Sequence, residues 1–146
     1  MSDVACKACG YNEVGESELP VRERVFLGEH WRAALRQTGI GGWLVIAVRR
    51  HIKSLTELSE NEMASLGPVL VSASRALVEV VGCERTYVVE FSEAMPHLHF
   101  NVVARMGDMP SNLRAFGVLG YDSMPHLADA DLDELARRLA RAWPSV

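Results

Sequence analysis

The chain has 146 residues, of which 49% are hydrophobic and 23% are charged, a balance typical of one globular domain and not of a disordered or fibrous protein. Its formal net charge of −4 argues against general nucleic-acid binding, which needs a clustered excess of lysine and arginine, but leaves room for one small phosphorylated ligand. No apolar run reaches the roughly 18 residues of a membrane helix. The N-terminus lacks the basic and apolar regions of a signal peptide, so we expect a cytoplasmic protein with no membrane partner.

Residues 1–20 are expected to form a polar, mostly irregular arm that carries Cys6-Lys7-Ala8-Cys9 and ends at Pro20. The chain has three cysteines, and an odd number fits thiols or metal ligands better than a disulfide framework. A C-x-x-C pair presents two thiolates at a spacing that suits one tetrahedral ion. The same spacing also serves redox chemistry, so both interpretations stay open at this point. Cys83 has no such neighbour, and we expect it to be a buried core thiol.

Five strands and a long helix are expected after the arm. The strands are short apolar segments bounded by turn residues, and they cover residues 24–27, 31–35, 43–48, 87–91 and 97–103. Ser59 and Glu62 have the spacing of a capping box, which begins the helix, and Gly82 ends it. Pro68 inside this helix should kink it or split off its first turn.

The remaining segments are a long loop and a second helix. Residues 106–128 contain several glycines and prolines, and loops of that length are usually functional or poorly ordered. Residues 129–146 carry an apolar stripe, with acidic residues at the beginning and arginines near the end, which suits a helix dipole. The order of elements predicts one α+β domain over residues 1–146, in which a five-stranded antiparallel sheet packs with one central and one C-terminal helix.

The densest chemical signal is His97-x-His99-x-Asn101. Alternate residues of a strand point to the same face, at a rise of about 3.3 Å per residue. Two imidazoles and one amide would therefore stand in a row. A solvated polar strand face explains the same pattern, and the spacing alone does not decide between the two.

Three segments resemble the histidine-triad family of nucleotidyl hydrolases and transferases, in that family's order. The first is Arg49-Arg50-His51-Ile52-Lys53-Ser54-Leu55 before the capped helix, and the second is Pro96 through Arg105, which is similar to the family's active strand. Met109 through Arg114 resembles a loop of one bacterial branch. The similarity covers roughly residues 6 to 120.

The resemblance implies a structural zinc ion and a nucleotide site. Zinc-bearing members, such as bacterial dinucleoside polyphosphate hydrolases, bind the metal through a set that corresponds here to Cys6, Cys9, His51 and His97. His99 is then the nucleophile toward the α-phosphate of a nucleotide or dinucleoside polyphosphate, through a covalent nucleotidyl-histidine. Asn101, backbone N–H groups near Met95, and Arg105 are the groups expected to bind the phosphate oxygens. The resemblance also implies a homodimer.

The chain departs from the family at three positions. Asn101 replaces the third histidine, Ala104 replaces a proline, and Trp43 stands where many members have histidine. The related hexose-phosphate uridylyltransferases carry glutamine at the third place, so an amide there is compatible with catalysis, although an amide cannot supply a proton. We therefore expect a nucleotide phosphohydrolase or nucleotidyltransferase. A non-catalytic nucleotide- or zinc-binding module is the alternative, and a redox or metal-sensing protein is a third.

Overall fold

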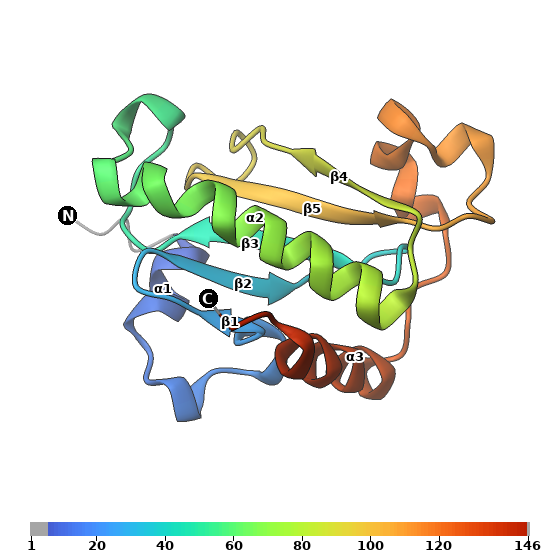
Figure 1. Ribbon diagram of the computed structural model, residues 1–146, viewed down its shortest axis with the longest axis horizontal. Coiled ribbons are helices and arrows are strands. Elements are labelled where there is room, and N and C mark those ends of the chain that lie inside the picture. Colours follow the sequence, from blue (N-terminus) through green and yellow to red (C-terminus); the bar gives the residue numbers. More distant parts are fainter. Residues whose placement is uncertain (1–5, 146) are drawn as a thin grey trace.

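The computed structural model of the chain describes residues 6–145. These residues form a five-stranded antiparallel sheet in the order β1-β2-β3-β5-β4 (Figure 1). The strands are β1 (Phe26–Leu27), β2 (Trp31–Leu35), β3 (Trp43–Val48), β4 (Arg85–Val89) and β5 (His99–Arg105). The predicted α+β class and its antiparallel sheet are confirmed. The first and last residues of the expected arm and C-terminal helix, 1–5 and 146, lie outside the described part.

Two helices cover one face of this sheet (Figure 1). They are α2 (Glu60–Val81) and α3 (Asp129–Ala142). Alternate residues of β3 and β5 point toward them and form the main core, because side chains alternate between the two faces of a strand. This core includes Leu44, Ile46, Val102, Leu77 and Leu139. Cys83 is 5% exposed in the same core, as expected, and burial raises the pKa of its thiol.

Helix α2 begins and ends as its sequence predicts. The Glu62 backbone N–H donates to the Ser59 hydroxyl, and the Ser59 N–H donates to the Glu62 carboxylate, 2.8 Å away. Gly82 ends the helix in the left-handed region at φ 67°. The helix continues without a break through Pro68, so the expected split is wrong. Pro68 lies on the exposed side, where the backbone carbonyl left without an N–H partner can be hydrated.

Helix α2 is long and apolar enough, by length and composition, to cross a membrane. The sequence analysis predicts no apolar run of that length. Core helices of water-soluble proteins pass the same test, and here one side of α2 packs on the sheet. That packing, through Val69, Ala73, Ala76 and Leu77, accounts for much of its apolar character.

The N-terminal arm is more regular than expected. Residues Lys7–Glu13 form helix α1, followed by two 3₁₀ turns at Glu16–Glu18 and Val21–Glu23. A helix this short is not stable by itself, and hydrogen bonds attach it to the sheet. The Asn12 amide donates to the Arg49 carbonyl oxygen over 2.9 Å, and its oxygen accepts from Arg32 Nε.

The segment expected to be a long loop forms short 3₁₀ helices, at Ser111–Leu113 and Ala115–Ser123. Its apolar side chains cover the second face of the sheet, at the end where β3 begins. Met109, Leu113 and Val118 bury Trp43 and Val103 there. The many turn residues of this segment predicted a loop. They gave no sign that its apolar side chains would pack on the sheet.

Candidate functional site

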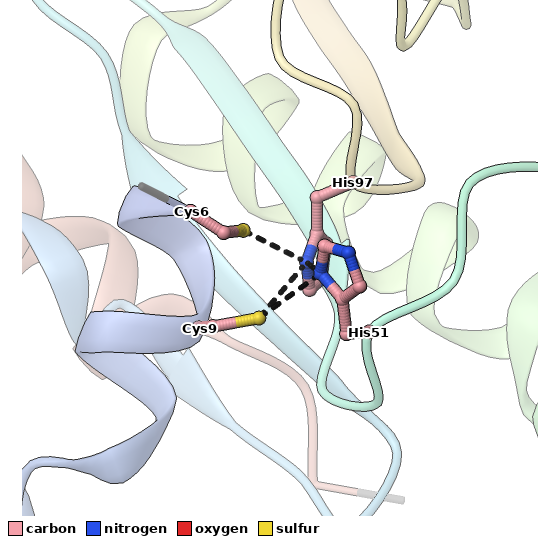
Figure 2. Close-up of side chains that lie close together, drawn as sticks. All are labelled: Cys6, Cys9, His51 and His97. Atoms are coloured by element: carbon pink, nitrogen blue, oxygen red, sulfur yellow. Dashed lines mark hydrogen bonds between the residues drawn. The ribbon is translucent and has the colours of Figure 1, made fainter. Parts of the chain in front are cut away.

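Four side chains from three separate segments meet beside the point where β3 ends and β5 begins (Figure 2). They are Cys6 and Cys9 at the start of α1, His51 after β3, and His97 before β5. All their ligand atoms lie within 4.8 Å of one another. The Nδ1 atoms of the two histidines are 3.2 Å apart, and Cys9 Sγ lies 3.1 Å from His51 Nδ1. The sequence prediction that these four residues form one site is met by their positions.

The spacing of these atoms fits a tetrahedral ion. Zinc binds nitrogen at about 2.0 Å and sulfur at about 2.3 Å, so its ligand atoms lie about 3.3–3.8 Å apart. The distances from His97 Nδ1 to the sulfur atoms of Cys6 and Cys9 are 3.4 and 3.6 Å. Two thiolates and two imidazoles form a closed donor set of the kind that structural zinc sites use. The residues therefore fit a structural zinc ion.

His97 is oriented by its backbone surroundings. Its side chain is fully buried, and Nε2 donates to the Val48 carbonyl oxygen, 2.6 Å away. This bond directs Nδ1 toward the cysteines, as carbonyl partners commonly do for metal-binding histidines. Burial lowers the pKa of the His97 imidazole, with the nearby His51 acting in the same direction. The neutral ring is the form that binds a metal.

His97 does not belong to the strand, contrary to the sequence expectation. Strand β5 starts at His99, and the preceding residues turn toward the segment after β3. The Leu98 N–H donates to the Ile52 carbonyl oxygen, and the His97 N–H donates to the Met95 carbonyl oxygen. His97 therefore points into the four-residue cluster, and of the three motif residues His99 and Asn101 alone share a face of the strand.

A cleft of about 460 Å³ lies next to the cluster, on the sheet face opposite α2. His99 and Asn101 form its floor with the small residues Ala47 and Val45 of β3. One wall comes from α1, the others from β2 and from the turn before β5. These walls are lined by Lys7, Ala8 and Tyr11, by Glu23, by Arg32, Ala34, Leu35 and Arg36, and by Phe91, Ser92, Glu93, Ala94 and Met95.

His99 presents one ring nitrogen to this cleft. Its Nδ1 donates to the His97 carbonyl oxygen over 2.7 Å, so Nδ1 carries the hydrogen and Nε2 keeps its lone pair. No hydrogen-bond partner of Nε2 occurs among residues 6–145. The backbone N–H of His99 donates to the Ser92 hydroxyl, 3.1 Å away. The ring orientation is thus fixed from two sides, and Nε2 is the ring nitrogen left for the cleft that His99 lines.

Asn101 contacts two groups at once. Its Oδ1 accepts from Trp43 Nε1 over 2.9 Å, and its Nδ2 donates to the Val89 carbonyl oxygen over 3.3 Å. The residue is 8% exposed. One N–H of the amide therefore remains without a partner in the described part of the chain.

The structure brings Met95 to the cleft but not Arg105. Met95 lines the cleft beside His99. Arg105 is the last residue of β5, six residues after His99, which corresponds to about 20 Å along an extended strand. Its guanidinium pairs with Glu84 at 2.6 Å. The expectation that Arg105 binds the phosphate is wrong, because the strand carries it to the far end of the sheet.

Sequence reasoning missed Ser92, Lys7 and Arg36. Lys7 and Arg36 are exposed cationic residues that line the cleft, and no motif singled them out. Ser92 adopts a left-handed backbone at φ 50°, which is uncommon for a residue other than glycine, asparagine or aspartate. That conformation has no sequence signal, although Ser92 lies in the segment expected to turn.

No protein-family model and no curated protein matches this chain in sequence. Solved structures do match it. A histidine triad protein from Bradyrhizobium japonicum is 20% identical, with a TM-score of 0.72 over 82% of this chain and 89% of that one. A zinc-bound histidine triad family protein from Mycobacterium smegmatis is 18% identical, with a TM-score of 0.68 over 95% and 93%.

A uridylyltransferase mutant is also similar, at 26% identity and a TM-score of 0.68. The match covers 94% of this chain but 46% of that one. The protein therefore has the fold of histidine triad proteins. Its cysteine and histidine cluster fits structural zinc, and a protein of the same fold is zinc-bound.

Proposed function

We propose that this chain is a zinc-bearing member of the histidine triad family that hydrolyses or transfers nucleotides at the α-phosphate. The observation that carries the proposal is the presentation of His99 Nε2 to the cleft, with Nδ1 held by the His97 carbonyl oxygen. Proteins of this fold include a nucleotide-binding histidine triad protein and a uridylyltransferase. The proposal extends their chemistry to this cleft.

The reaction has two displacements. In the first, the Nε2 lone pair of His99 attacks the α-phosphorus, an N–P bond forms, and the P–O bond to the leaving phosphate chain breaks with its electron pair. In the second, a water or another phosphate oxygen attacks the same phosphorus and the N–P bond breaks. Water yields the nucleoside monophosphate and releases one proton to solvent; a phosphate acceptor yields a transferred nucleotide.

The chain's own groups bind the phosphate oxygens. Asn101, whose amide keeps one unpartnered N–H, and Met95 line the cleft with His99 and are placed to supply these donors. Lys7 and Arg36 add positive charge at its rim, which attracts a polyphosphate. Arg32 also lines the cleft, but it pairs with Glu23 at 2.7 Å. Because its charge is already paired, Arg32 stabilises the cleft wall and adds little net positive charge for a phosphate ligand.

The zinc ion, when bound, supplies structure and no reacting group. It joins the start of α1 to the turn before β5 through Cys6, Cys9, His51 and His97. Lys7 and Ala8 stand between the two cysteines and line the cleft. The metal site thus holds one wall of the cleft and the carbonyl group that orients His99.

A substrate screen tests the proposal. Dinucleoside polyphosphates and nucleoside phosphoramidates are incubated with the purified protein, and released monophosphate is measured. Turnover of either class, with a nucleotidyl adduct trapped on quenching in base, where the N–P bond is stable, supports the enzyme. Nucleotide binding in calorimetry without product or adduct would favour the alternative, a non-catalytic nucleotide- or zinc-binding module, for which the replacement of the third histidine by Asn101 is the supporting feature.

The proposal includes a cytoplasmic homodimer. Helix α2 exposes Met63, Val71 and Val78, which are 54%, 48% and 49% exposed, on the side away from the core. Burying this side against a second copy would cover apolar surface.

A further inference from the structure

The side-chain amide of Asn101 has only one orientation that satisfies its surroundings. Trp43 Nε1 lies 2.9 Å from Asn101 Oδ1, and an indole N–H can only donate, so its partner must be the amide oxygen. The Val89 carbonyl oxygen can only accept, so its partner must be the amide nitrogen. Two independent contacts therefore select the same orientation, which resolves the usual ambiguity between oxygen and nitrogen.

Trp43 is itself held in place. It is 3% exposed, and the segment that follows β5 packs over it. The Tyr121 ring lies 4.4 Å from its ring, and the Arg36 guanidinium lies 5.6 Å from its centroid and donates to the Tyr121 hydroxyl. The indole N–H is thus a fixed donor beneath the cleft floor.

Asn101 and His99 lie two residues apart on one face of β5, at a Cα separation of about 6.6 Å. Their partners across β3 are Val45 and Ala47, which are small and leave the space between them open. The remaining N–H of Asn101 is therefore the donor on the strand next to a phosphorus bound at His99 Nε2.

We propose that Trp43 is a positioning residue that makes Asn101 a hydrogen-bond donor toward the cleft, and that this arrangement selects phosphoanhydride substrates over phosphoramidates. The inference rests on the proposed function. A leaving phosphate departs as an anion and needs a donor but no proton. An amine leaving group departs only if its nitrogen takes up a proton, which an amide cannot give.

The test uses Trp43→Phe, which removes the N–H and keeps an aromatic ring, and Asn101→Asp, which keeps the acceptor toward Trp43 and replaces the donor. Trp31→Phe is the matched control. Its indole N–H donates to Ser65 on the opposite face of the sheet, so it loses a buried hydrogen bond away from the cleft. A dinucleoside polyphosphate and a nucleoside phosphoramidate are the two substrates.

Wild type should cleave the polyphosphate at least about tenfold faster than the phosphoramidate, and Trp43→Phe should lower kcat for the polyphosphate about tenfold with little change in KM. Asn101→Asp should lower kcat for the polyphosphate by more than Trp43→Phe does. Asn101→His should gain phosphoramidate turnover, since it restores a titratable group. Equal rates on both substrates in wild type, or wild-type kcat in Trp43→Phe, would overturn the proposal.

A measurement without turnover separates this inference from the proposed function. In ¹⁵N NMR spectra, the Asn101 side-chain amide should exchange slowly with water in wild type and in Trp31→Phe, and faster in Trp43→Phe. Unchanged exchange in Trp43→Phe refutes the positioning role even if the protein is an active enzyme. Faster exchange in a protein that turns over no substrate upholds the positioning of the amide and refutes the reaction.

Discussion

The ring of His99 donates from Nδ1 to the backbone carbonyl oxygen of His97, 2.7 Å away. The His97 ring is in turn held by the Val48 carbonyl oxygen and faces the two cysteines. The residue that completes the metal site therefore also orients the proposed nucleophile. Loss of the metal should disturb the fold and the cleft together.

Purified protein should contain about one zinc ion per chain without added metal. Cys9→Ala should lose it and lower Tm by about 10 °C, because zinc binds the folded chain and not the unfolded one. Metal analysis and thermal unfolding measure both effects, with Cys83→Ala as a control cysteine outside the cluster. A protein that contains no zinc but a Cys6–Cys9 disulfide would support the redox interpretation instead.

Ser92 offers a way to separate backbone strain from hydrogen bonding. Ser92→Ala keeps the left-handed backbone and removes the hydroxyl that accepts from His99 N–H. It should cost about 1–2 kcal/mol of stability and lower kcat about tenfold. Ser92→Gly should recover about 1 kcal/mol of that stability, because glycine tolerates this φ, without recovering activity. Full activity in both variants would show that the hydroxyl does not position His99.

Glu62 should make stability depend on pH. Its hydrogen bonds with Arg50, followed by those with Ser59, lower the pKa of the carboxyl from its ordinary 4.5 to about 2. Because the folded-state pKa is below the unfolded one, the stabilisation is fully present above pH 4.5 and is lost as the pH falls toward 2. The Arg50 guanidinium stays charged throughout this range, and Glu57 is the other acidic residue near it.

The matched variants are Glu62→Gln, which keeps capping-box chemistry, and Glu60→Gln, which removes an exposed charge from the same helical turn. Urea unfolding at pH 7 should show a loss of about 2 kcal/mol for Glu62→Gln and under about 0.5 kcal/mol for Glu60→Gln. Near pH 2.5 the difference between wild type and Glu62→Gln should largely disappear. A difference that stays constant with pH would assign the effect to packing.

The dimer prediction is tested by light scattering over a dilution series. Val71→Glu places a charge on the exposed side of α2 and should shift the protein toward monomer, whereas Arg75→Glu, on the same helix but already charged, should shift it less. A wild-type monomer at every concentration would refute the dimer and leave the site unaffected.

The sequence predicted correctly those features that depend on neighbouring residues in the chain. The capping box at Ser59 and the stop at Gly82 depend on residues within one helical turn. The sequence also identified the four residues of the metal site. That identification came from the resemblance to the histidine-triad family, because the spacing of Cys6 and Cys9 alone left a redox role open.

Features that depend on packing between segments far apart in the chain could not be predicted from the sequence. Helix α1 is stabilised by Arg32 and Arg49, and residues 111–123 are ordered by Trp43 and its neighbours. His97 lies outside the strand because its backbone N–H donates to the Met95 carbonyl oxygen and the Leu98 N–H donates to the Ile52 carbonyl oxygen. Arg105 was wrongly assigned because the motif showed its order in the chain and not its distance from the cleft.

The most direct test of the account is single-turnover chemistry at His99. Wild type, mixed with a labelled dinucleoside polyphosphate and quenched in base, where the N–P bond is stable, should yield a nucleotidyl adduct on the protein. His99→Ala should yield none while keeping its zinc and its Tm. His99→Gly should regain part of the turnover with added imidazole, which supplies the missing nitrogen nucleophile. Wild-type turnover in His99→Ala would contradict the account.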